Sequence, residues 1–132
     1  MFGIKHIEFW VRDLGRTLEF YRAFLPIIGW EEDGSNGFCC GTQKIYFKLA
    51  PPRAICKKCC FGPRHICFHS MRRDGVDQVA SRVQSISPNA IFRGPQEIIG
   101  EEYSPDYYAV YFRDPDGFIL EVAYSPNSPL DR

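Results

Sequence analysis

The sequence has no excess of charge of either sign and contains no long apolar run. Its 132 residues include 16 lysines and arginines and 16 aspartates and glutamates, so the formal net charge is zero. Such a balance gives no net field that would attract nucleic acid or an acidic membrane surface. No stretch approaches the roughly 20 apolar residues of a membrane-spanning helix, and the first residues lack the uninterrupted apolar core of a signal peptide. We therefore expect a cytoplasmic protein that binds no nucleic acid and no membrane, and whose partner is a small molecule or a second copy of the chain.

The composition is otherwise that of a globular protein. Hydrophobic residues make up 45% and aromatic residues 15%, which is too apolar for a disordered chain. A chain of this length has the size of one domain and buries roughly two-thirds of its unfolded surface. We therefore expect residues 1–132 to form a single domain.

Cysteine is the one residue type whose number invites a special explanation. The six cysteines are Cys39, Cys40, Cys56, Cys59, Cys60 and Cys67. Cys56 and Cys59 have the spacing of zinc ligands, but a closed structural zinc site needs two more ligands. Adjacent cysteines such as Cys39 and Cys40 point to opposite faces of a strand and cannot both turn inward. With an adequate core and no export signal, we expect free thiols rather than disulfides.

The first half of the chain predicts one helix among several strands. Residues 3–11 alternate between apolar and polar side chains, as a half-buried strand does. Asp13 is a plausible N-cap, and Pro26 would close the helix that follows. The apolar stripe of this helix would consist of Leu14, Leu18, Tyr21 and Leu25. Turn-forming residues then separate short strand-like runs at 27–31, 37–40 and 45–49.

The same order recurs in the second half. Residues 64–70 predict a strand, and 74–86 predict a helix with a stripe of Val76, Val79, Val83 and Ile86. Further strands are expected at 90–93, 107–112 and 118–124. The chain is therefore expected to be an α+β protein of two βαβββ modules. A duplicated module is the simplest account, and it rests on pattern rather than on residue identity. The modules would span 1–49 and 64–124, with a linker at 50–63 and a tail at 125–132.

Three polar side chains fall on the faces that the helices leave uncovered. Because each helix covers the apolar face of its sheet, the other face is available for a site. Alternation places His6 and His65 on that face of the two first strands and Glu121 on that face of the last strand. Two imidazoles and one carboxylate are a ligand set for Fe(II), Mn(II), Zn(II) or Ni(II). The alternative for each residue alone is a solvated or hydrogen-bonded strand side chain.

The motifs around these residues resemble those of the vicinal oxygen chelate superfamily, which includes glyoxalase I, fosfomycin-resistance transferases, extradiol dioxygenases and bleomycin-binding proteins. The similar segments are His6-Ile-Glu-Phe-Trp-Val-Arg-Asp13 with Phe20-Tyr21, then His65-Ile-Cys-Phe68, and Asp114-Pro-Asp-Gly-Phe-Ile-Leu-Glu121. The resemblance covers nearly the whole chain and implies a glyoxalase-like fold, in which a curved mixed sheet surrounds a metal-binding cleft. It also implies that His6, His65 and Glu121 are the metal ligands.

The resemblance extends to further site residues. Tyr111 stands ten residues before Glu121, where the transferases and dioxygenases place a tyrosine near the substrate oxygen or the metal. When the strand ending at Leu49 is laid on the last strand, Lys48 falls opposite Glu121, where glyoxalase I has a carboxylate or glutamine. A lysine has three donors and no acceptor, so glyoxalase I chemistry is disfavoured. The candidate catalytic residues are Tyr111, Lys48 and Glu8, and the candidate substrate-binding residues are Trp10, Tyr46 and Cys67.

Three functions follow as hypotheses. The first is a metal-dependent lyase, transferase or dioxygenase whose substrate chelates the metal through adjacent oxygens. The second is a metal-free small-molecule binding protein of the bleomycin-resistance type, and the third is a regulatory member that has lost turnover. The resemblance also predicts a homodimer with the site at or near the interface, in which His6 of one subunit completes the site of the other.

Overall fold

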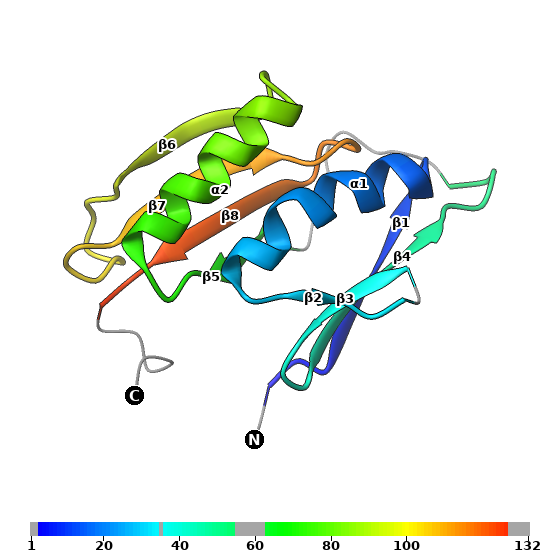
Figure 1. Cartoon of the computed structure of the whole chain (residues 1–132), viewed down its shortest axis with the longest axis horizontal. Helices are drawn as coiled ribbons and strands as arrows, with labels where there is room; N and C mark the ends of the chain where they lie inside the picture. Colours follow the sequence, from blue (N-terminus) through cyan, green and yellow to red (C-terminus); the bar gives the residue numbers. More distant parts are fainter. Residues whose placement is uncertain (1–2, 35, 55–62, 127–132) are drawn as a thin grey trace. The chain divides into compact units, whose positions relative to one another are not determined.

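The computed structural model describes residues 3–34, 36–54 and 63–126. The chain divides into two compact units, Met1–Arg64 and His65–Arg132. Each unit has one long helix and four strands in the order β-α-β-β-β, and each helix covers one face of the sheet of its own unit (Figure 1). The predicted α+β fold of two βαβββ modules is therefore confirmed.

The first unit contains a four-stranded mixed sheet in the order β1-β4-β3-β2, with β1 parallel to β4. Its elements are β1 His6–Val11, α1 Leu14–Phe24, the 3₁₀ helix η1 Leu25–Ile28, β2 Glu31–Glu32, β3 Gly37–Cys40 and β4 Gln43–Leu49. The strand predicted at 27–31 is wrong, because Leu25–Ile28 form a 3₁₀ helix that Gly29 ends at φ 90°. Only Glu31–Glu32 are extended there.

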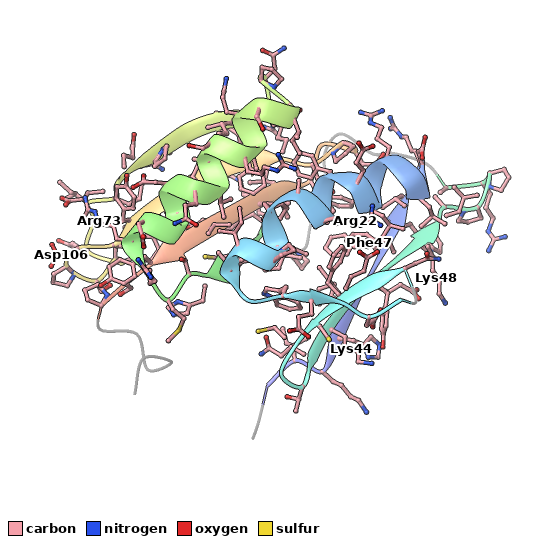
Figure 2. All side chains as sticks on the ribbon, in the orientation of Figure 1. Arg22, Lys44, Phe47, Lys48, Arg73 and Asp106 are labelled. Atoms are coloured by element: carbon pink, nitrogen blue, oxygen red, sulfur yellow. The ribbon has the colours of Figure 1, made fainter. Side chains whose placement is uncertain are left out.

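Helix α1 packs its aromatic side chains onto the sheet. It begins as predicted at Asp13, whose Oδ1 accepts the Arg16 N–H at 3.0 Å. The buried residues of the helix are Thr17, Phe20, Tyr21 and Phe24. Leu14 and Leu18 of the predicted stripe are only half-buried, because the larger aromatic rings set which face turns inward. The rings of Tyr21 and Phe47 lie 4.5 Å apart in this core, and Figure 2 labels Phe47.

The second unit repeats the arrangement with the sheet order β5-β8-β7-β6. Its elements are β5 His65–His69, α2 Arg73–Ile86, β6 Ile91–Glu97, β7 Tyr108–Arg113 and β8 Ile119–Tyr124. The predicted stripe of α2 is confirmed at Val76, Val79 and Val83, all fully buried. Ile86 is 41% exposed, because it ends the helix beyond the edge of the packed face. Strand β6 runs four residues further than predicted and passes Pro95, which an edge strand tolerates.

A side-chain-stabilised turn fixes the start of β8. Asp114 is 5% exposed, and its Oδ1 accepts the N–H groups of Asp116 and Phe118, both at 2.9 Å. The Phe118 carbonyl in turn accepts the Asp114 N–H at 2.9 Å. These bonds replace backbone partners that a tight turn cannot supply. They hold the antiparallel register of β7 and β8, in which Tyr111 lies opposite Glu121.

The structure describes three of the six cysteines and only parts of the predicted linker and tail. Cys56, Cys59, Cys60 and most of the predicted linker and tail lie outside the described residues. Within 3–34, 36–54 and 63–126, the cysteines Cys39, Cys40 and Cys67 are free thiols, as expected. No helix in these described ranges is long and apolar enough to cross a membrane.

Candidate metal and substrate site

His65 and Glu121 meet on the face of the second sheet that α2 leaves uncovered. Strands β5 and β8 are parallel, and Cys67 is the Cα partner of Glu121, so His65 lies diagonally across from the acid. The Nε2 atom of His65 lies 3.1 Å from Oε2 of Glu121. The Glu121 side chain is 3% exposed, whereas that of His65 is 37% exposed. The structure thus brings together two of the three residues that the sequence suggests as ligands.

The buried carboxylate of Glu121 has a neutral hydrogen-bond donor as its second partner. The Tyr107 hydroxyl donates to Oε1 of Glu121 at 2.6 Å, and it also lies 3.7 Å from Sγ of Cys67. In the described part of the chain, no lysine or arginine forms a salt bridge with Glu121. Burial, followed by the hydrogen bond to Glu121, raises the pKa of Tyr107, so its hydroxyl remains a donor at neutral pH. A buried carboxylate in such surroundings favours a cationic partner.

Tyr111 and Cys67 flank this pair. The ring of Tyr111 lies 6.0 Å from that of His65 in an edge-to-face arrangement, and the Arg93 guanidinium lies 5.5 Å from the Tyr111 ring centroid. Burial, followed by the charge of Glu121, raises the pKa of Tyr111. Desolvation and the same carboxylate raise the pKa of Cys67 to about 12. Cys67 is therefore a protonated thiol at neutral pH and not a nucleophile.

The remaining predicted site residues share the uncovered face of the first sheet. They are His6, Glu8, Trp10, Tyr46 and Lys48. The rings of His6 and Tyr46 lie 5.4 Å apart, and Nζ of Lys48 lies 2.9 Å from Oε1 of Glu8. Both members of this ion pair are exposed, so the pair adds about 0–1 kcal/mol to stability. Figure 2 shows Lys44 and Lys48 along β4.

The strand register corrects the predicted equivalence of Lys48 and Glu121. His6 pairs with Lys44 and Glu8 with Tyr46, whereas His65 pairs with Ile119 and Cys67 with Glu121. Superposing the two histidines therefore makes Tyr46, and not Lys48, the counterpart of Glu121. The strand next to Tyr46 presents Gly37 to it, whereas the strand next to Glu121 presents Tyr111. A Cβ atom at Gly37 would collide with the carbonyl oxygen of Ile45 and press against the Tyr46 ring.

The donor set of the second unit fits a divalent cation. Within either unit, the described residues include no cluster of three or more histidine, cysteine, aspartate or glutamate side chains arranged to hold a metal ion. His65 and Glu121 supply one imidazole nitrogen and one carboxylate oxygen 3.1 Å apart, and among the described residues no lysine or arginine is paired with this buried acid. Imidazole and carboxylate are the donors that Fe, Mn, Zn and Ni accept. The pair therefore fits as part of a site that needs a third ligand from elsewhere.

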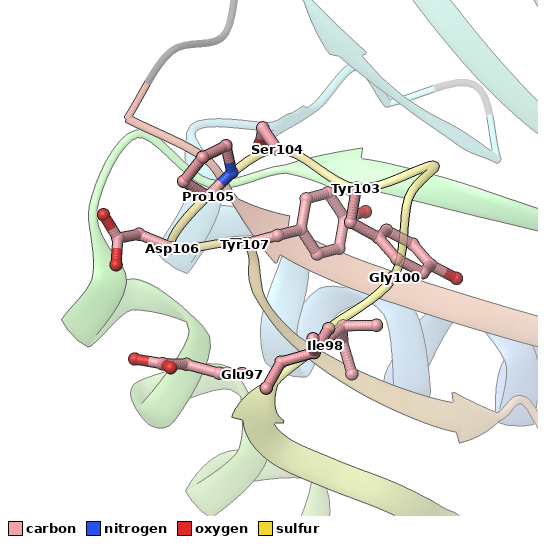
Figure 3. Close-up of a pocket in the computed structure, with 9 residues that line it drawn as sticks. Glu97, Ile98, Gly100, Tyr103, Ser104, Pro105, Asp106 and Tyr107 are labelled. Carbon is pink, nitrogen blue, oxygen red and sulfur yellow. The ribbon is translucent and has the colours of Figure 1, made fainter.

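Residues 98–107, which precede β7, cover part of the face that the sequence led us to expect to be free. Ile98 packs with Ala109, Tyr111 and Ala123, and Tyr103 joins this cluster. The segment also lines a pocket of about 220 Å³ (Figure 3). The rings of Tyr103 and Tyr107, 5.0 Å apart, form part of this lining. Tyr107 was not among the predicted site residues. The sequence feature that could have identified it is its position two residues before Ala109 and four before Tyr111, which places it on the same face.

Comparisons with known proteins agree on the fold. No protein-family model matches the sequence. The uncharacterised Bacillus subtilis protein YqjT is 25% identical over 126 residues, which cover 90% of this chain and 96% of YqjT. A provisionally assigned glyoxalase from Bacillus halodurans has a TM-score of 0.74 at 23% identity, with 92% of this chain and 95% of that chain covered. The fosfomycin resistance protein FosX from Listeria monocytogenes has a TM-score of 0.66 at 20% identity, with 100% and 98% covered.

These structures define the class of the fold. Another neighbour, a glyoxalase/bleomycin resistance protein from Albidiferax ferrireducens, has a TM-score of 0.66 at 20% identity and covers 93% of this chain and 98% of its own. The chain has a glyoxalase-like fold, as its motifs predicted. At these identities the similarity establishes the fold, and the activity must be argued from the site.

Proposed function

We propose that the chain is a metal-dependent enzyme of the vicinal oxygen chelate type, acting on a small substrate that chelates the metal through two adjacent oxygens. The observation that supports this most directly is the contact between His65 and the buried Glu121 on the face of the second sheet opposite α2. His6, on the corresponding strand and face of the first unit, is the proposed third ligand. The bound cation, one of Fe, Mn, Zn or Ni, would stabilise negative charge that develops on a substrate oxygen.

The surrounding side chains have distinct proposed roles. Tyr111 donates a hydrogen bond to a substrate oxygen beside His65, and its raised pKa keeps that proton in place at neutral pH. Glu8 and Lys48, already paired with each other, are the candidate proton carriers. Trp10, Tyr46 and Cys67 are proposed to contact the substrate. Tyr46, at the position of the first module equivalent to Glu121, supplies a phenol and no carboxylate, so we favour transferase, dioxygenase or another lyase reaction over the glyoxalase I reaction.

Metal analysis of the chelator-free wild-type chain tests this proposal. We expect close to one divalent ion for each chain after dialysis against micromolar Fe(II), Mn(II), Zn(II) or Ni(II), measured by elemental analysis. A chain that retains no ion under any of these conditions would refute the enzyme and favour metal-free sequestration of a small molecule. Oxygen uptake with catechol under Fe(II) would then separate a dioxygenase from redox-neutral reactions.

We further propose a homodimer in which His6 of one copy completes the site of the other. The supporting observation is that His6 lies on an exposed face of its own sheet. An equimolar mixture of His6→Ala and Glu121→Ala chains, refolded together, tests it. One site in each mixed dimer would be intact, so about one quarter of the wild-type metal content is expected. If the three ligands belong to one chain, the mixture should bind no more metal than either variant alone.

A further inference from the structure

Tyr107 contacts Glu121, the buried acid of the proposed site. Its hydroxyl donates to Oε1 of Glu121 at 2.6 Å, while Oε2 of the same carboxylate lies 3.1 Å from His65 Nε2. We propose that Tyr107 is a positioning residue, which holds the Glu121 carboxylate so that Oε2 is the oxygen presented to the cation beside His65. The inference rests on the proposed function, because it concerns how a metal ligand is oriented.

The hydrogen bond from Tyr107 restricts the orientation of the Glu121 carboxylate. The terminal torsion of a glutamate is broad, so an isolated carboxylate exchanges its two oxygens easily. A short hydrogen bond from a hydroxyl to a charged carboxylate is about twice as strong as one between neutral groups, and it removes this freedom. With Oε1 engaged, Glu121 can offer a single oxygen to a metal. Groups that hydrogen-bond a metal ligand in this way tune its affinity for the metal.

Tyr107 is itself held in place at both its backbone and its ring. Its N–H donates to the Ser104 carbonyl at 3.2 Å, and its carbonyl accepts the Ile98 N–H at 2.9 Å. Its ring packs 5.0 Å from that of Tyr103, along the wall of the pocket in Figure 3. An anchored phenol loses little additional freedom when it binds Glu121, so the carboxylate is oriented before any ligand arrives.

The next residue in the chain offers a matched control. The Tyr108 hydroxyl donates to Oδ1 of Asp77 at 2.6 Å, so it makes the same kind of bond at the same length to a carboxylate on α2. Tyr108 pairs with Tyr124 and not with Glu121. Tyr107→Phe and Tyr108→Phe therefore each remove one hydroxyl–carboxylate hydrogen bond of the same length. Only the bond of Tyr107 involves the proposed metal ligand.

Titration of the full-length chain with Co(II) compares the wild type with Tyr107→Phe and Tyr108→Phe. We expect Tyr107→Phe to bind Co(II) about 10–100-fold more weakly and with an altered visible absorption band. Tyr108→Phe should match the wild type in both readouts, and thermal melting should show both variants folded. Equal affinities and spectra for the two variants would overturn the role of Tyr107 and leave the metal site standing. A wild-type chain that binds no Co(II) would overturn both the metal site and this inference.

Discussion

A His65→Ala chain should lose its bound divalent metal and keep its fold. The substitution removes the imidazole nitrogen 3.1 Å from Oε2 of Glu121. Changing a group that only supports a metal ligand costs roughly 10–100-fold in affinity, so removing a ligand should cost more than about 100-fold. Glu121 keeps the Tyr107 hydroxyl as a partner, and the buried Phe68 of β5 is untouched, so the strand should remain in the sheet. Elemental analysis after dialysis, with circular dichroism alongside, measures both outcomes.

His69 provides the control for this experiment. It lies four residues further along β5, where its Cα partner is Ala123. His69→Ala should retain the wild-type metal content, because its side chain is not part of the proposed ligand set. If His65→Ala still bound one tight ion, the metal would be held elsewhere in the chain, and Cys56 and Cys59 would be the next residues to replace.

Replacing Phe47 by alanine should cause the largest loss of stability among the substitutions considered. Phe47 is 1% exposed and lies at the centre of a cluster of rings, 5.4 Å from Phe9, 4.5 Å from Tyr21 and 6.4 Å from Phe38. Deleting a buried ring leaves a cavity and costs about 3–5 kcal/mol in the free energy of unfolding. Urea denaturation followed by fluorescence measures this change.

Leu49 on the same strand serves as the comparison for Phe47. Its side chain is 60% exposed, so Leu49→Ala removes little buried surface and should cost less than about 1 kcal/mol. A similar small loss for Phe47→Ala would show that the ring cluster is not the centre of the first unit's core.

The fold was accessible to sequence analysis because both modules repeat strong local signals. Alternation in β1, the Asp13 cap and the valine stripe of α2 each correspond to a structural element at nearly the predicted place. The incorrect predictions lie in and just after α1. In α1 the aromatic rings, and not Leu14 and Leu18, occupy the buried face. In the range of the strand expected at 27–31, a 3₁₀ helix continues through Ile28, because proline is favoured in the first turn of a helix and Gly29 ends it at φ 90°.

The site was accessible only in part, because it depends on pairing between distant strands. Alternation identified the face that carries His65, Glu121 and Tyr111, and these side chains are neighbours. The register between β1 and β4 cannot be read from two short strands of low identity, so Lys48 was matched to Glu121 in place of Tyr46. Tyr107 was missed because its hydrogen bond to Glu121 depends on how residues 98–107 fold back over the sheet.

Gly37 makes the difference between the two modules difficult to reverse. Each module places one phenol ring beside its histidine. The ring of Tyr46 comes from β4, which pairs directly with the strand of His6. The ring of Tyr111 comes from β7, which is separated from the strand of His65 by β8. Moving the first module to the arrangement of the second would need a side chain at Gly37, where the Ile45 carbonyl leaves no space for a Cβ atom. Backbone sterics at Gly37 therefore exclude a counterpart of Tyr111 from the first module.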